Sequence, residues 1–109
     1  MSSDKQNALS TPNDSVFVIL SMQVDLAKMD EFLIMMREAV EDTRAWEGCQ
    51  MLDIYVDQDK PGRVVFYEIW TSRDEYETYF KWREDAGFIE KMADFITSEL
   101  DISFLSKEG

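Results

Sequence analysis

The sequence predicts a single α+β domain of the ferredoxin-like type, with the element order β-α-β-β-α-β and one antiparallel sheet with helices on one face. Short segments in which apolar residues alternate are separated by longer segments with apolar residues at helical spacing. The length of 109 residues suits one domain with one hydrophobic core. We expect the polar residues 1–14 to form a flexible tail and residues 15–109 to form the domain.

A strand followed by an amphipathic helix is predicted for the first half of the domain. Residues 15–25, SVFVILSMQVD, are β-branched and apolar on both faces, which is typical of a central strand. From about residue 28 to 46 the apolar positions recur at helical spacing. Asp30 and Glu31 suit the start of this helix because the helix dipole favours acids there, and Gly48 suits its end.

A hairpin, a second helix in two pieces and a last strand are predicted for the second half. Residues 49–57 and 63–71 have the composition of strands and flank the turn sequence QDKPG. The sequence SRDE from Ser72 matches a capping box, and Gly87 is expected to break or bend the helix that begins there. LDISFL, residues 100–105, closes the chain as a strand. A second amphipathic stretch is indicated by Phe88, Ile89, Met92, Phe95 and Ile96.

Helices on one face of the sheet leave the other face to be covered. Both faces of the strand at 15–25 are apolar, and residues 1–14 are too polar to cover one of them. We therefore expect a second copy of the sheet to do so, in a symmetric homodimer.

The composition excludes several classes of partner and cofactor. A net charge of −12 repels nucleic-acid phosphates and anionic membrane surfaces, so neither is expected as a partner. The lone Cys49 and the absence of a membrane-spanning apolar run favour a cytoplasmic protein. Without His or paired cysteines the chain offers no metal constellation, and its isolated glycines form no phosphate loop. No cofactor is expected.

Three segments of the sequence, WEGCQMLDIYVD, VVFYEIWTS and YETYFKWREDAGFIEKM, resemble the antibiotic biosynthesis monooxygenase (ABM) domain family. The resemblance extends over about residues 16–105 and implies a dimeric α+β barrel with a small pocket between sheet and helices. Some members of that family oxidise quinol- or anthrone-like aromatics with molecular oxygen and without metal, flavin or nicotinamide. Other relatives degrade haem.

The chain departs from the family pattern at one informative position. Many members carry His nine residues after the tryptophan of their Glu-x-Trp motif. Counting from Trp70, that position is Tyr79, and the chain contains no His at all. Haem degradation usually needs a histidine ligand there, so the resemblance favours oxygen chemistry without haem.

Glu68 and Trp70 are the first candidates for a catalytic role. They lie two apart on the predicted strand and therefore share a face. In a pocket, Trp70 would stack on an aromatic ligand and donate its indole N–H, and Glu68 would orient a hydroxyl or accept a proton if burial raises its pKa. The alternatives are a core role for Trp70 and an ion pair between Glu68 and an arginine such as Arg83.

The second helix supplies the next candidates. Tyr79 would hydrogen-bond a substrate oxygen, or pack in the core or against the pocket with its hydroxyl satisfied by the protein. Tyr76 and Trp82 would flank the same pocket, and Trp82 would alternatively reach the partner subunit. Arg83 would hold an anionic ligand or form a salt bridge in the dimer.

Substrate-binding candidates also occur on the strands. Gln23 is polar within an otherwise apolar strand, so it needs a partner, either a ligand or a neighbouring element. Tyr55 on the third predicted segment is a further candidate. A pliable apolar pocket wall is expected from Met35, Met36 and Met92.

The leading hypothesis from the sequence is a cofactor-independent monooxygenase acting on a small aromatic, quinol-type molecule. The alternatives are a non-catalytic dimer that binds a small molecule or has a regulatory role, and a ferredoxin-like dimer whose pocket is filled by its own side chains. The absence of an obvious general base in the sequence favours the non-catalytic alternative.

Overall fold

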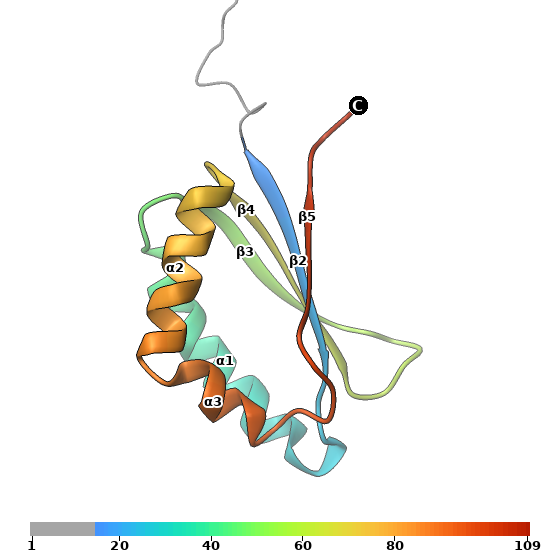
Figure 1. Ribbon diagram of the computed structural model, residues 1–109. Coiled ribbons are helices and arrows are strands. Elements are labelled where there is room, and N and C mark those ends of the chain that lie inside the picture. Colours follow the sequence, from blue (N-terminus) through green and yellow to red (C-terminus); the bar gives the residue numbers. More distant parts are fainter. Residues whose placement is uncertain (1–14) are drawn as a thin grey trace, which may run out of the picture.

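The computed structural model describes residues 15–109 and has the predicted element order (Figure 1). The strands are β2 (Val16–Gln23), β3 (Cys49–Val56), β4 (Arg63–Trp70) and β5 (Asp101–Leu105). The helices are α1 (Met29–Arg44), α2 (Arg73–Asp85) and α3 (Phe88–Ala93), and a short 3-10 turn, η2 (Leu26–Lys28), precedes α1. The predicted tail, residues 1–14, lies outside the described residues.

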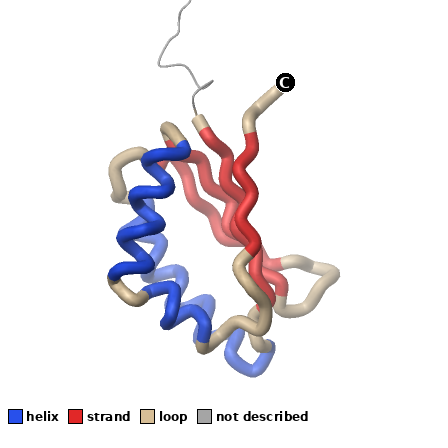
Figure 2. The backbone as a smooth tube through the Cα atoms, in the orientation of Figure 1, coloured by secondary structure: helices blue, strands red, loops and turns tan. Residues whose placement is uncertain are grey.

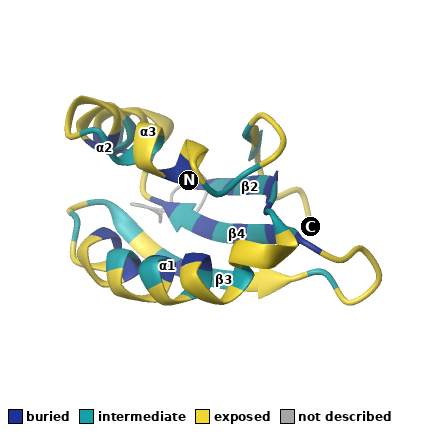
Figure 3. Ribbon diagram, turned by 90° about the horizontal axis from the view of Figure 1, so that it is seen from below, coloured by how far each residue is buried: buried dark blue, intermediate teal, exposed yellow. Residues whose placement is uncertain are grey.

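All four strands form one antiparallel sheet in the order β3-β4-β2-β5, so β2 is an interior strand, as predicted. The helices lie on one face of this sheet, which confirms the ferredoxin-like α+β fold (Figure 2). Along β2 and β4 every second side chain points towards the helices and is buried. The core therefore lies between the sheet and the helices, whose outward sides are exposed (Figure 3).

Local sequence chemistry sets where the elements begin and turn. The Ser72 hydroxyl accepts a hydrogen bond from the Glu75 backbone N–H at 3.1 Å, so the predicted cap starts α2. In the β3–β4 turn, Gly62 has a φ of 87°. A side chain at Gly62 would also meet the carbonyl oxygen of Val24 at 2.7 Å, so the position requires glycine.

The end of the helical region differs from the sequence prediction. Gly87, with a φ of 82°, separates α2 from α3 as expected, but α3 ends before Phe95 and Ile96. The backbone N–H of Asp25 donates to the carbonyl of Phe95 at 2.8 Å, and Ile96 forms a bridge with Val24. The chain leaves the helix here because these residues extend the edge of the sheet.

The face of the sheet turned away from the helices, which we call the outer face, is apolar at its centre. Its residues Phe17, Ile19, Val65, Tyr67 and Ile69 are half-buried, and Phe17 stacks on Tyr67 with ring centroids 6.4 Å apart. None of the helices within residues 15–109 covers this face. None of them is long and apolar enough to cross a membrane.

Candidate functional site

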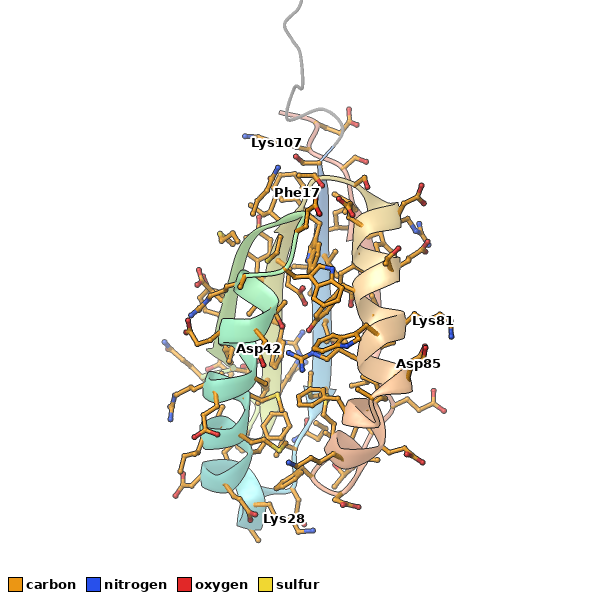
Figure 4. All side chains as sticks on the ribbon, turned by 90° about the vertical axis from the view of Figure 1, so that its left-hand side faces the viewer. Phe17, Lys28, Asp42, Lys81, Asp85 and Lys107 are labelled. Atoms are coloured by element: carbon orange, nitrogen blue, oxygen red, sulfur yellow. The ribbon has the colours of Figure 1, made fainter. Side chains whose placement is uncertain are left out.

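A small cavity lies between the sheet and the helices, and its volume is about 30 Å³. Viewed from the helix side, side chains fill most of the space between α1 and α2 in front of the strands (Figure 4). The strands contribute Leu20, Leu52, Phe66 and Glu68 to the cavity wall, and the helices contribute Met36, Ala39, Val40, Thr43, Tyr76, Tyr79, Phe80, Arg83, Phe88, Ile89 and Met92. A cavity of this size holds about one or two water molecules.

Glu68 is the acid of this cavity. Its side chain is almost fully buried, and its Oε1 accepts a hydrogen bond from the indole N–H of Trp70 at 2.9 Å. Burial raises the pKa of Glu68 from 4.5 to about 7, because a low-dielectric surrounding disfavours the charged form. The hydrogen bond from Trp70 opposes this rise. Glu68 therefore exchanges its proton near neutral pH, as a general base must.

Tyr76 presents the free hydroxyl of the cavity. Its side chain is 2% exposed, and its Oη is buried without a hydrogen-bond partner among the described residues. Burial, followed by the charge of the nearby Glu68, raises the pKa of Tyr76, so its hydroxyl stays protonated. A buried hydroxyl without a hydrogen-bond partner lowers the stability of the folded protein, so Tyr76 is well suited to donate a hydrogen bond to a ligand in the cavity.

The hydroxyl of Tyr79, in contrast, is hydrogen-bonded to other side chains of the protein. It lies 2.6 Å from Thr43 Oγ1 and accepts a hydrogen bond from Arg83 Nε at 2.9 Å. Arg83 Nη2 also donates to Thr43 Oγ1 at 3.0 Å and to the carbonyl of Ala39 at 2.9 Å. Burial raises the pKa of Tyr79 as well. These contacts join α2 to α1 across the cavity.

The guanidinium of Arg83 is held between aromatic rings. Its Cζ lies 4.7 Å from the ring centroid of Trp82 and 4.5 Å from that of Phe88. Arg83 is buried, and it forms no ion pair with any of the described residues. The ion pair between Glu68 and Arg83 that the sequence left open is therefore absent from this part of the chain.

The other sequence candidates lie outside the cavity wall. Trp70 is fully buried behind Glu68, packed on the rings of Tyr76 and Tyr79. Trp82 is partly exposed and stacks on Trp46 with centroids 4.7 Å apart.

The two strand candidates also lie away from the cavity. The Nε2 of Gln23 donates a hydrogen bond to the carbonyl of Pro61 at 2.6 Å. Its partner is therefore a neighbouring element of the protein, the second of the two alternatives that the sequence left open. Tyr55 is exposed, beside Arg37 and Arg44.

Thr43 is not among the site residues that the sequence predicts, yet it lines the cavity and hydrogen-bonds with both Tyr79 and Arg83. Its only signal is a hydroxyl on the otherwise apolar face of α1. Met36 and Met92 line the cavity as expected, whereas Met35 packs against the core elsewhere. Within residues 15–109, no group of three or more potential metal ligands comes together. Burial raises the pKa of Cys49 to about 11, so this thiol is a poor nucleophile.

Comparison with protein families identifies the chain. Residues 15–91, which include both strands of the β3–β4 hairpin, all of α2 and the first part of α3, match the model of the antibiotic biosynthesis monooxygenase (ABM) family. This chain belongs to that family. The chain is 24% identical over 90 residues to the uncharacterized protein sll1783 of Synechocystis sp.. The alignment covers 83% of this chain and 61% of that relative, so the chain spans less than two thirds of its length.

Solved structures show the same ABM-type fold. A conserved protein from Methanosarcina mazei Go1 superposes with a TM-score of 0.80 at 18% identity, covering 89% of this chain and 96% of that one. A protein from Nitrosomonas europaea, provisionally named an antibiotic biosynthesis monooxygenase, superposes with a TM-score of 0.73 at 21% identity. That alignment covers 87% of this chain and 91% of the other. At these identities the similarity shows the fold.

Proposed function

We propose that this ABM protein is a cofactor-independent monooxygenase that oxidises a small aromatic, quinol- or anthrone-like compound with molecular oxygen. Family membership supports the reaction class. The observation that supports catalysis most strongly is Glu68, a buried carboxyl on the cavity wall with a pKa of about 7. Such a group would serve as the general base, a role that the sequence left conditional on burial.

In the proposed reaction, ionised Glu68 accepts the proton of a substrate hydroxyl or enol. The resulting anion is rich in electrons at a ring carbon, which reacts directly with molecular oxygen to form a peroxide. When the O–O bond breaks, one oxygen atom stays on that carbon and the other leaves as water, which takes up the hydrogens lost by the substrate. All the electrons that reduce oxygen come from the substrate, so the reaction needs no further reductant.

We assign distinct roles to the aromatic residues around Glu68. Trp70 acts as a positioning residue, because its indole N–H already holds Glu68 Oε1. Tyr76 donates its free hydroxyl to the substrate oxygen. For Tyr79, a direct contact with substrate stays a prediction from the sequence. Its contacts with Thr43 and Arg83 favour the role of holding Arg83 in place.

The size of the cavity adds a requirement to this proposal. A cavity of about 150 Å³ admits a benzene ring, whereas this one has about 30 Å³. An aromatic substrate must therefore displace side chains of the wall. We propose that α3 moves, because it is a six-residue helix that follows Gly87 and contributes Phe88, Ile89 and Met92 to the wall.

We also propose that the outer face pairs with a second copy of the chain. Phe17, Ile19, Val65, Tyr67 and Ile69 form a continuous apolar surface across β2 and β4. The dimers typical of the ABM family support this arrangement. A contiguous apolar patch on a sheet face is typical of a protein–protein interaction site.

Oxygen uptake with a panel of hydroquinones and anthrones tests the proposed activity. We expect at least one compound to be consumed faster than its uncatalysed oxidation, with one atom of isotopically labelled O₂ in the product. Tyr76→Phe should lower the rate about tenfold, since it removes one hydrogen bond to the reacting oxygen. Tyr79→Phe is the matched control and should lower it less. Background rates for every compound with a correctly folded protein would contradict the proposal.

A further inference from the structure

Arg83 is a buried cation without an anionic partner in residues 15–109. It is 7% exposed, and its hydrogen-bond acceptors are the neutral groups of Tyr79, Thr43 and Ala39. Its Nη1 has no hydrogen-bond partner within the same residues and keeps some access to solvent, because it is not among their fully buried atoms. Buried charges in proteins are as a rule paired, because an unpaired charge loses its hydration without compensation.

Glu68 shares the cavity with Arg83 but does not neutralise it. Burial raises the pKa of Glu68 and the hydrogen bond from Trp70 lowers it, and Glu68 forms no ion pair with Arg83. A guanidinium in contact would hold that pKa down. The chain has 23 acidic residues against 11 basic ones, so a partner for Arg83 would be easy to supply. Within residues 15–109, the absence of an anion beside Arg83 is therefore a property of this site.

Tyr76 gives a second, independent indication of a ligand. The residue is 2% exposed and lines the same cavity, and its hydroxyl is buried without a partner among the described residues. A guanidinium can only donate hydrogen bonds, and a phenol held protonated is also a donor. The Tyr76 hydroxyl and Arg83 Nη1 both lack an acceptor among residues 15–109, and an anionic oxygen is the acceptor that a cation binds most strongly.

We propose that the site takes an acidic aromatic ligand, a quinol-type ring with a carboxylate that binds Arg83 and a hydroxyl that reaches Glu68 and Tyr76. The proposal rests on the proposed function, because it names the substrate class of the same site. The rings of Trp82 and Phe88 lie against the guanidinium and fix its orientation. The edge that carries Nη1 remains for the carboxylate.

Binding measured by calorimetry without oxygen tests this proposal, because it does not depend on turnover. Gentisic acid is a one-ring quinol with a carboxylate, and methyl gentisate is its neutral ester of similar size. We expect the wild-type protein to bind the acid about tenfold or more tightly than the ester. Arg83→Met should weaken binding of the acid more than binding of the ester and so remove the preference, and Arg83→Lys should restore part of it because the charge remains.

Arg44→Met is the matched control, because Arg44 is also near the end of a helix but is paired with Glu41 at the surface. It should leave the preference for the acid intact. Equal affinities of the wild-type protein for acid and ester, or no binding of either, would overturn the inference even if Arg83→Met failed to fold. A preference for the acid without oxygen uptake would support the inference and contradict the monooxygenase. Oxygen uptake without a preference for the acid would support the monooxygenase and contradict the inference.

Discussion

Glu68→Gln is expected to stabilise the protein by on the order of 3 kcal/mol above about pH 7. In the folded protein Glu68 keeps its proton up to about pH 7, whereas its ordinary pKa is 4.5. The folded state therefore binds more protons than the unfolded state between these values, and stability falls as the pH rises through this window. Glutamine cannot ionise, and its side-chain oxygen still accepts the hydrogen bond that Trp70 donates.

Urea denaturation of the wild-type protein and the variant at about pH 4.5 and about pH 8 measures this effect. The advantage of Glu68→Gln should be present at the higher pH and nearly absent at the lower one. Glu77→Gln is the control, since Glu77 is an exposed acid paired with Arg73 and should change stability by less than about 1 kcal/mol at either pH. A variant less stable than wild type at the higher pH would show that Glu68 is not a desolvated acid.

Ile19→Glu is expected to convert a dimer into a monomer. Ile19 lies at the centre of the outer face, opposite Tyr67 on β4 and Ser103 on β5. In a symmetric dimer the change places a charge from each subunit into an apolar interface, where burial without a partner costs several kcal/mol. Light scattering should give twice the chain mass of 12.8 kDa for wild type and the chain mass for the variant.

The same substitution at Ile34 provides the control for the dimer. Ile34 is a 57% exposed residue of α1, on the opposite side of the sheet from the outer face. Ile34→Glu should leave the mass at the dimer value. A wild-type protein that is monomeric at micromolar concentration would contradict the proposed pairing of outer faces.

The fold was largely predictable because its signals are local. The period-two alternation on β2 and the helical spacing on α1 each span many residues, and the cap at Ser72 depends on a backbone N–H only three residues away. The early end of α3 was not predictable from spacing. It depends on Val24 and Asp25, which lie about seventy residues earlier and pair with Ile96 and Phe95.

The site was predictable in its residues but not in their connections. The shared face of Glu68 and Trp70 follows from strand geometry, but the hydrogen bond between them and the burial behind its high pKa follow from tertiary packing. Tyr76 and Tyr79 lie three apart on one face of α2, so spacing treats them alike. Thr43 on α1 forms a hydrogen bond with the hydroxyl of Tyr79, whereas the hydroxyl of Tyr76 has no hydrogen-bond partner among the described residues.

The pH profile of oxygen uptake by the wild-type protein and by Glu68→Gln tests the central claim most directly. After subtraction of the uncatalysed rate, kcat/KM of the wild type should rise with an apparent pKa near 7, because Glu68 must be ionised to accept the substrate proton. Glu68→Gln should lose about a hundredfold or more of this rate at every pH. A variant that keeps the wild-type rate and profile would show that Glu68 is not the base.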